Sequence, residues 1–369
     1  MQRIKGFDGI RALCALAVLL GHAGIPQAWS TAEWWQRLYL TAFSHIQAVI
    51  TFFVLSGYLI SQLLAREKAA NGRVAYGWFL VRRVLRLVPA YAVYLFVLAV
   101  LAATEVLNPH PLAFVAGLTY TYNYLPRTFG SPYTNHLWSL SLEEQFYLLY
   151  PLLLRWRGGA RLPLTILVII GLGVLLTQLI PAIPLPEWSF PYRGSSHSLS
   201  DFRLGELWSL KYWLVPAGLY CLVGCWFGLQ RTDGPGSRWL LVAALVLYLH
   251  PWGYRIAFGG MSIVLQCVGL GCFLRYLQLR QESRLVYLLE LGPLPFLGRI
   301  SYGTYVWHGI FVTTGRGAWQ YWWQGWPWGF LFTYATACLS YYFVERPFLV
   351  RKDRFRPAGL SSHHDKRKH

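Results

Sequence analysis

An arginine and a histidine occur where a membrane-spanning stretch should be apolar. Arg11 and His22 are separated by ten uncharged residues, a run too short to cross a bilayer. Because helical residues rise by ~1.5 Å and turn by ~100°, the two side chains share one helix face roughly 16 Å apart. This spacing suits an elongated ligand with an anionic end at Arg11 and a reacting end at His22. The alternative is a topological anchor at Arg11, paired with Asp8, and an interfacial histidine.

A pair of arginines predicts a phosphate site beside the third apolar stretch. Arg83 and Arg86 lie on adjacent turns of one predicted helix face, in the run RRVLRLVP. Guanidinium groups match phosphate oxygens through two parallel hydrogen bonds, so the pair indicates a phosphate-bearing cytoplasmic ligand. Helix anchoring and contact with lipid head groups would explain the same two residues.

Two adjacent carboxylates lie inside the fourth apolar stretch. Glu143 and Glu144 fall about two turns into it, and Tyr147 follows Glu143 by one turn. At this depth, at least one carboxylate should face a cavity, pair with an Arg or His, or accept a substrate proton. His308 lies inside another apolar stretch, where a hydrogen-bonded structural role and a catalytic role are both open.

Membrane helices must position these residues. Of 369 residues, 55% are apolar and 13% are charged, whereas soluble chains carry about 25% charged residues. The stretch 112–125 is too short and too polar to cross, and we predict that it is re-entrant or interfacial. We predict an all-α polytopic membrane protein with ten spanning helices, near residues 8–25, 45–65, 84–104, 137–154, 162–180, 207–229, 238–250, 256–276, 297–315 and 327–346.

The distribution of charge predicts the topology. Cytoplasmic loops hold an excess of Lys and Arg. With ten spans, 26 of the 33 basic residues fall on one side and 7 on the other, which places both ends of the chain in the cytoplasm. Topology then accounts for most of the net charge of +18, and no nucleic-acid partner is indicated.

Other chemical signals are weaker. All six cysteines lie in apolar runs without the spacing of a disulfide framework or a zinc site, so no metal is predicted. Residues 1–350 are assigned to the membrane domain and 351–369 to a basic, disordered tail. One polar cluster of the outward loops comprises His197, Asp201, Arg203 and Glu206. Its aromatic surroundings suit either a sugar groove or an interfacial belt.

Six motifs resemble, in order, those of the acyltransferase 3 family. They read GFDGIRALCALAVLLGHAG, FFVLSGYLIS, FLVRRVLRLVPAY, LWSLSLEEQFYLLYP, LGRISYGTYVWH and YYFVERPFL, and they extend from residue 6 to about 350. Members of this family are integral membrane enzymes that O-acetylate surface polysaccharides, peptidoglycan and some small molecules. The resemblance implies a ten-span enzyme of the bacterial inner membrane that moves acetyl from cytoplasmic acetyl-CoA to an extracytoplasmic carbohydrate or glycolipid.

The resemblance also implies roles for individual residues. Arg11 and His22 match the family's Arg-x10-His pair, which makes His22 the expected general base and places Arg11 beside the donor. Arg83 and Arg86 match the Arg-x-x-Arg pair associated with acyl-CoA, and Glu143 matches the acidic residue of the WSLxxE motif. Acetyl-CoA is expected as a donor co-substrate, without a tightly bound cofactor. Acceptor-binding or supporting roles are implied for Glu144, Tyr147, Ser301, Tyr302 and His308.

The chain departs from the family pattern in two places. Many members carry Gly-Val-Asp or Gly-Val-Glu before the Phe-Phe of the second span, whereas this chain reads Ala48-Val49-Ile50-Thr51. The role of that acid is then absent or relocated. The SGNH-type domain of some members is also not expected, so the membrane domain alone should hold the acceptor.

Three other interpretations are open at this stage. A polytopic transporter could use Arg11, His22 and Glu143 as a proton or anion pathway without covalent chemistry. Within the enzyme class, the acyl group could differ from acetyl. Cys14 could also carry it covalently, although three residues past Arg11 it lies near the donor's phosphate end.

Overall fold

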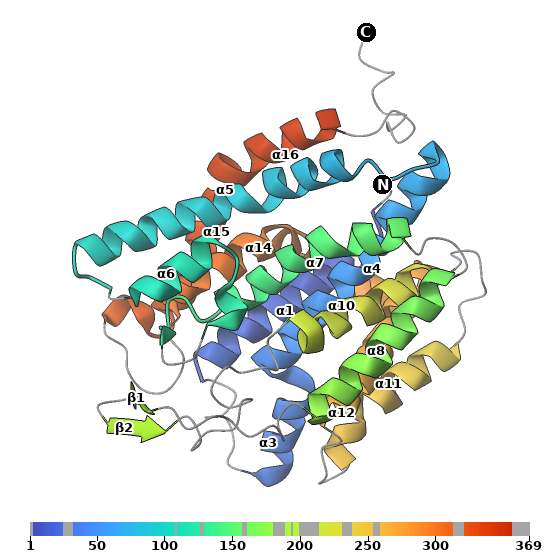
Figure 1. Ribbon diagram of the computed structural model, residues 1–369, viewed down its shortest axis with the longest axis horizontal. Helices are drawn as coiled ribbons and strands as arrows, with labels where there is room; N and C mark the ends of the chain where they lie inside the picture. Colours follow the sequence, from blue (N-terminus) through green and yellow to red (C-terminus); the bar gives the residue numbers. More distant parts are fainter. Residues whose placement is uncertain are drawn as a thin grey trace.

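The long helices run side by side through most of the molecule, as the computed structural model shows (Figure 1). Within the described residues, the regular structure is helical apart from one antiparallel hairpin of β1 (Ser189–Tyr192) and β2 (Ser195–Ser198). The predicted helical class is therefore confirmed. The structure describes residues 3–24, 32–107, 109–125, 129–156, 161–179, 189–192, 195–198, 214–230, 238–253, 259–312 and 321–355.

A helix occupies each of the ten predicted span positions, because in a bilayer the backbone must satisfy its own hydrogen bonds. In the described residues, α4, α5 and the Ser262–Leu279 part of α12 are long and apolar enough to cross a membrane. They are compatible with a membrane protein, and ten crossings stay a prediction. The ten helices are α1 (Phe7–His22), α4 (His45–Asn71), α5 (Tyr76–Ala103), α7 (Leu137–Trp156), α8 (Arg161–Leu179), α10 (Leu214–Gly228), α11 (Arg238–Gly253), α12 (Gly259–Leu279), α14 (Leu294–Phe311) and α15 (Trp328–Leu339).

Shorter helical elements connect these helices. They are α3 (Glu33–Leu38), η1 (Tyr39–Phe43), α6 (Pro111–Leu118), η2 (Tyr122–Tyr124), α13 (Arg284–Leu289), η7 (Trp322–Gln324), η8 (Ser340–Glu345), α16 (Arg346–Lys352) and η9 (Asp353–Phe355). With eight residues, α6 is about 12 Å long and too short to cross a bilayer. This length agrees with the expectation that 112–125 does not span.

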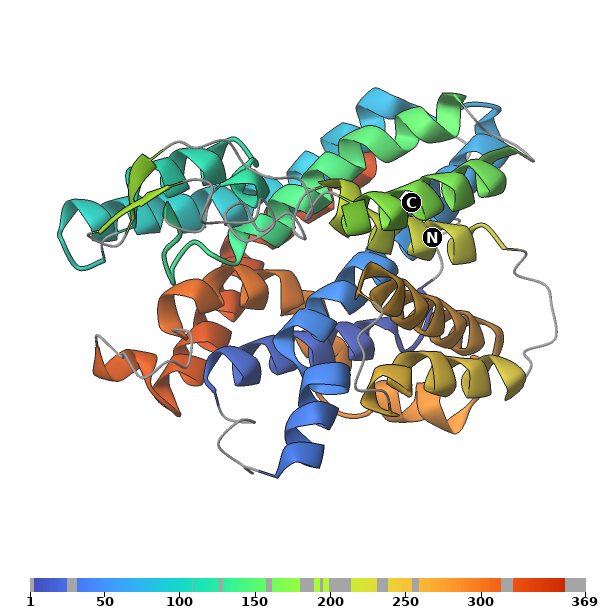
Figure 2. The same cartoon turned by 60° about the horizontal axis from the view of Figure 1, so that its bottom comes forward.

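Glycines let the central helices approach closely. A Cβ on Gly57 of α4 would lie 1.9 Å from the carbonyl oxygen of Cys221 on α10, and one on Gly298 of α14 would lie 1.9 Å from that of Asp8 on α1. Small residues at such crossings allow backbone contact inside a membrane. Viewed from a second side, α14 and α15 lie beside α1, while α11 and α12 pair along their lengths (Figure 2).

One helix begins earlier than predicted. Helix α5 starts at Tyr76, whereas the sequence placed this span from residue 84. Arg83 and Arg86 therefore lie inside the helix and not at its end. Hydropathy underrates this part of α5, because it scores arginines as polar even where they turn inward to line a cavity.

Ordered structure also continues past the predicted start of the tail at residue 351. Helix α16 ends at Lys352 and η9 continues to Phe355, with α16 lying along α5 (Figure 1). Arg82 Nη1 of α5 donates a hydrogen bond of 2.8 Å to the carbonyl oxygen of Phe355. This contact fixes residues 353–355 on the bundle. Residues 356–369 lie outside the described part of the chain.

Candidate active site

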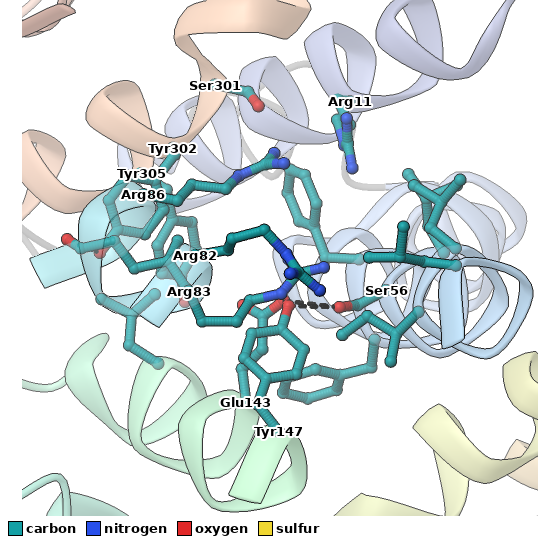
Figure 3. Close-up of a pocket in the computed structure, with 18 of the residues that line it drawn as sticks. Arg11, Ser56, Arg82, Arg83, Arg86, Glu143, Tyr147, Ser301, Tyr302 and Tyr305 are labelled. Carbon is teal, nitrogen blue, oxygen red and sulfur yellow. Dashed lines mark hydrogen bonds between the residues drawn. The ribbon is translucent and has the colours of Figure 1, made fainter. Parts of the chain in front are cut away.

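A cavity of about 440 Å³ lies among α1, α4, α5, α7 and α14. Its volume is in the range of small-molecule sites, roughly 300–1,000 Å³. Figure 3 shows the guanidinium groups of Arg82 and Arg83 beside Glu143 and Tyr147 of α7, with those of Arg11 and Arg86 on the side toward Ser301. Seven of the residues singled out in the sequence line this cavity: Arg11, Arg83, Arg86, Glu143, Tyr147, Ser301 and Tyr302.

The lining is strongly basic. Six basic residues and two acidic ones line the cavity, and an apolar surround strengthens their field. Arg83 lies over the rings of Phe79 and Tyr147, with its Cζ 5.3 and 4.9 Å from their centroids. Arg11 Nη1 lies 3.4 Å from Asp8 Oδ1, so this arginine both pairs with Asp8 and lines the cavity. The arrangement suits an anionic ligand.

A third arginine of α5 has a structural contact instead. Arg82 Nη2 lies 2.7 Å from Glu67 Oε2, and Glu67 is fully buried. The second oxygen of Glu67 accepts a hydrogen bond of 2.8 Å from the backbone N–H of Ala75. Arg82 and Glu67 therefore join α5 to α4 as a buried ion pair. Arg82 also lines the cavity, with its charge paired by Glu67, whereas Arg83 and Arg86 line it without an ion pair among the described residues.

Glu143 is held by two hydroxyl groups. Ser56 Oγ of α4 donates to Glu143 Oε1 over 2.7 Å, and Tyr147 OH, one turn along α7, donates to the same oxygen. Ser56 Oγ also lies 2.5 Å from Tyr147 OH, so the three groups form a triangle (Figure 3). Glu144 is half-buried and does not line the cavity.

Ser56→Ala is expected to reduce turnover roughly tenfold, because hydrogen bonds to a charged group contribute about 1.5–3 kcal/mol. The change leaves Glu143 without one of its two donors beside Arg83. The measurement is kcat/KM with the donor and acceptor expected from the sequence, acetyl-CoA and a carbohydrate. Ser61→Ala is the matched control, because Ser61 Oγ donates to the backbone carbonyl of Tyr58 on the same helix, away from the cavity. Equal losses in both variants would contradict a role for Ser56 in the site.

Hydroxyl groups of α14 form the opposite wall. Ser301 Oγ donates to the carbonyl oxygen of Gly298 and Tyr302 OH to that of Leu87, each over 2.8 Å. Tyr305 OH lies 2.6 Å from Ser139 Oγ of α7. Ser301 and Tyr302 are therefore bonded to backbone. Tyr305 and Ser139 bond to each other, and each also lies within hydrogen-bonding distance of the carbonyl oxygen of His136, at 3.3 and 3.0 Å.

Four histidines from separate elements gather beyond this wall. His22, the last residue of α1, has its ring centroid 4.8 Å from that of His45 at the start of α4 and 4.9 Å from that of His308 on α14. His308 is in turn 4.7 Å from His136, which directly precedes α7. Tyr305 lines the cavity and also contacts His308, with ring centroids 5.2 Å apart. We call these four residues the histidine cluster.

Hydrogen bonding fixes the tautomer of the predicted base. His22 Nδ1 lies 2.8 Å from the carbonyl oxygen of Val18. Because a carbonyl can only accept, Nδ1 must carry the hydrogen, and Nε2 of the neutral ring keeps a free lone pair. The bond to Val18 therefore leaves His22 in the form that a general base needs.

The sequence interpretation missed Ser56, Ser139 and Tyr305 of the cavity and His45 and His136 of the histidine cluster. His136 is 4% exposed, and within the described residues its Nδ1 makes no hydrogen bond. Its position directly before the LWSLSLEE run was the available signal. His45 Nδ1 is likewise buried without a hydrogen-bond partner there. It starts a helix after a serine cap, which gave no hint of chemistry.

Some expectations cannot be placed. Asp201, Arg203 and Glu206 lie outside the described residues, and the side chain of His197 in β2 is also not described. The position of the missing acid is occupied by buried Thr51, whose hydroxyl donates to the carbonyl oxygen of Gln47 over 2.8 Å. The six cysteines are free thiols, and no set of metal-ligating side chains occurs in the described ranges.

Together these features define a helical membrane protein with an arginine-lined cavity and a histidine cluster inside its bundle. Residues 4–345 match the acyltransferase 3 model, described as an acyltransferase domain. The chain therefore belongs to the acyltransferase 3 family. No solved structure matches it.

Curated relatives carry names that agree with this family. The chain is 27% identical to "Peptidoglycan O-acetyltransferase OatA" of Listeria monocytogenes, over 95% of this chain and 56% of the relative. It is also 27% identical to "O-acetyltransferase OatA" of Staphylococcus aureus strain NCTC 8325, over 96% of this chain and 58% of the relative. The chain thus spans little more than half the length of these relatives. A transporter is not favoured by the comparison.

Proposed function

We propose that this protein is a membrane-embedded O-acyltransferase that moves acetyl from acetyl-CoA to a carbohydrate hydroxyl on the other side of the membrane. One observation carries the proposal. Helix α1 presents Arg11 to a basic cavity and ends at His22 in the histidine cluster, and these residues are roughly 16 Å apart along the helix. The family and the names of its relatives agree with acyl transfer.

The donor would enter at the basic end of the cavity. Arg11, Arg83 and Arg86 would hold the phosphates of coenzyme A, which match planar guanidinium groups. The pantetheine arm would extend past Glu143 toward Tyr305, which contacts the histidine cluster. In this arrangement Glu143 orders the donor end of the cavity, since its hydrogen bonds go to Ser56 and Tyr147.

The reaction would take place at His22. Its Nε2 would remove the proton of the acceptor hydroxyl as the hydroxyl oxygen attacks the thioester carbonyl carbon. The carbon–sulfur bond would then break, and the sulfur of coenzyme A would take the proton from the imidazolium. The products are an O-acetyl ester and free coenzyme A, and no other reactant is needed.

The acceptor would be a surface or exported carbohydrate. The Listeria relative is named for peptidoglycan, which makes peptidoglycan the first candidate. The purified protein in lipid nanodiscs, given acetyl-CoA labelled in its acetyl group, is expected to release coenzyme A and label muropeptides. Mass spectrometry of surface glycans with and without the protein would identify the acetylated sugar. Transport of acetyl-CoA or protons without ester formation would overturn the proposal in favour of the transporter.

Ten spans with both ends in the bacterial cytoplasm complete the proposal, and reporter fusions test this topology. A reporter that works only in the cytoplasm is expected to be active after residue 70 or 234 and inactive near 195, because basic residues concentrate on the side of the first two sites. A periplasmic reporter at the same positions should give the opposite pattern. A periplasmic reporter that is active after residue 70 or 234 would overturn the predicted topology and, with it, the proposed direction of transfer.

A further inference from the structure

A second cavity lies outside the site just described. It has a volume of about 830 Å³ and lies between the turn that joins α4 to α5 and the last turns of α7. It shares no lining residue with the arginine-lined cavity. The hydrogen bond of 3.2 Å from Tyr76 OH to the carbonyl oxygen of Leu148 ties the start of α5 to α7 and so holds its walls together.

Three basic residues line this cavity, and none of them has a carboxylate partner among the described residues. They are Lys68 at the end of α4, Arg73 in the turn and Arg155 at the end of α7. The neighbouring carboxylate, Glu67, is already bound by Arg82 and by the N–H of Ala75. Among the described residues, none of the three cations takes part in an ion pair. The site therefore has an unneutralised positive charge.

The other walls are apolar and continue into an exposed apolar surface. Trp78, Val81 and Leu152 line the cavity, and Trp78 and Leu152 are 52% and 44% exposed. Leu149 lies one turn before Leu152 on α7 and is 50% exposed, and Trp156 at the end of α7 is 71% exposed. Exposed leucines on a membrane helix face lipid tails, and tryptophans gather where tails meet head groups. This combination of exposed leucine and tryptophan is the one expected at the level of the lipid head groups.

We propose that this cavity binds an anionic glycerophospholipid. Its phosphate would be held by Lys68, Arg73 and Arg155, while an acyl chain lies along Trp78 and Leu152. Basic pockets between helices at the membrane surface bind acidic head groups in this manner. A soluble phosphate would use the cations but would gain nothing from the apolar wall, so the combination of both walls favours a lipid.

The affinity for lipid tests this assignment. Each basic residue near an anionic lipid surface contributes about 1 kcal/mol of binding free energy, which is about fivefold in affinity. Loss of three should therefore weaken binding by roughly 100-fold at low salt. The delipidated protein would be titrated with phosphatidylglycerol or phosphatidylcholine and bound lipid counted by native mass spectrometry. We expect tight binding of phosphatidylglycerol, and at least a tenfold loss for the variant Lys68→Gln, Arg73→Gln, Arg155→Gln.

The control removes the same charge elsewhere. Arg284→Gln with Arg299→Gln and Arg351→Gln changes three exposed arginines that line neither cavity, and it should bind phosphatidylglycerol like the wild type. If the triple variant at the cavity does not fold, Arg73→Gln alone, in an exposed turn, should still show about a fivefold loss.

Three results would overturn the proposal. One is equal binding of phosphatidylcholine, which lacks net charge. Another is an equal loss of lipid in the control variant. The third is displacement of phosphatidylglycerol by millimolar glycerol 3-phosphate, which would mark a site for soluble phosphates. Conversely, Leu152→Gln should weaken lipid binding, since it alters only the apolar wall.

Discussion

His22→Ala is expected to abolish acetyl transfer while the protein stays inserted and folded. Loss of a general base typically lowers the rate by ~10² to 10⁴. In this chain the geometry for the base is already present, because the bond from Nδ1 to Val18 leaves Nε2 free to accept a proton. Turnover with acetyl-CoA and a carbohydrate acceptor is the measurement, and acetyl-CoA affinity should stay near wild type because His22 does not line the arginine-lined cavity.

Two further variants sharpen this test. His22→Gln keeps a side-chain N–H that can bond to Val18 but lacks a group that takes up a proton, so it should be as inactive as the alanine variant. His110→Ala changes an exposed histidine that caps α6 outside the cluster, and it should retain activity. More than a tenth of wild-type turnover in His22→Ala would rule out the proposed base.

The helices could be predicted from the sequence because hydropathy is a local property. Each of the ten predicted positions holds a helix, and the largest error, at the start of α5, arose where basic residues interrupt the apolar run. The short length of α6 was also predictable. The number of membrane crossings does not follow from helix lengths, since within the described residues only three helices are long and apolar enough to span.

The cavity could be predicted only in part. Arg11, Arg83 and Glu143 are far apart in the sequence and meet because α1, α5 and α7 line one cavity in the folded bundle. Their connection came from the family resemblance, not from spacing. Sequence spacing also could not predict that Arg82 has a different partner from Arg83 and Arg86. Arg82 and Arg83 both line the cavity, but Arg82 pairs with Glu67 while Arg83 lies over the ring of Tyr147. These contacts depend on tertiary packing.

The histidine cluster lay beyond prediction for a related reason. His45, His136 and His308 come from three elements that approach His22 only in the folded bundle. A lone histidine at a helix start or in a turn gives no periodic signal. The structure thus adds partners around a residue that the sequence had already identified. His22 does not line the arginine-lined cavity, whereas Tyr305 lines it and contacts His308 of the histidine cluster.

Arg83→Ala with Arg86→Ala is expected to weaken acetyl-CoA binding by roughly 100-fold. Each charge-assisted hydrogen bond contributes about 1.5–3 kcal/mol, so the loss of two costs about 3 kcal/mol or more, which is a factor of about 100 in Kd. Titration of acetyl-CoA into the purified protein measures the effect. Arg299→Ala with Arg351→Ala removes the same charge from exposed positions outside the cavity and should leave the affinity unchanged.

Lysine replacements distinguish phosphate recognition from anchoring. The positive-inside signal counts Lys and Arg alike, so Arg83→Lys with Arg86→Lys should insert normally whichever role the pair has. If the pair binds phosphate through planar guanidinium groups, lysine loses the two-point geometry, and acetyl-CoA should bind several-fold more weakly. The same variant should lose much of the difference between coenzyme A and dephospho-coenzyme A if the pair contacts the 3′-phosphate. Unchanged acetyl-CoA affinity in both double variants would mean that other basic residues of the cavity lining, such as Arg11, Arg66 or Lys352, hold the donor.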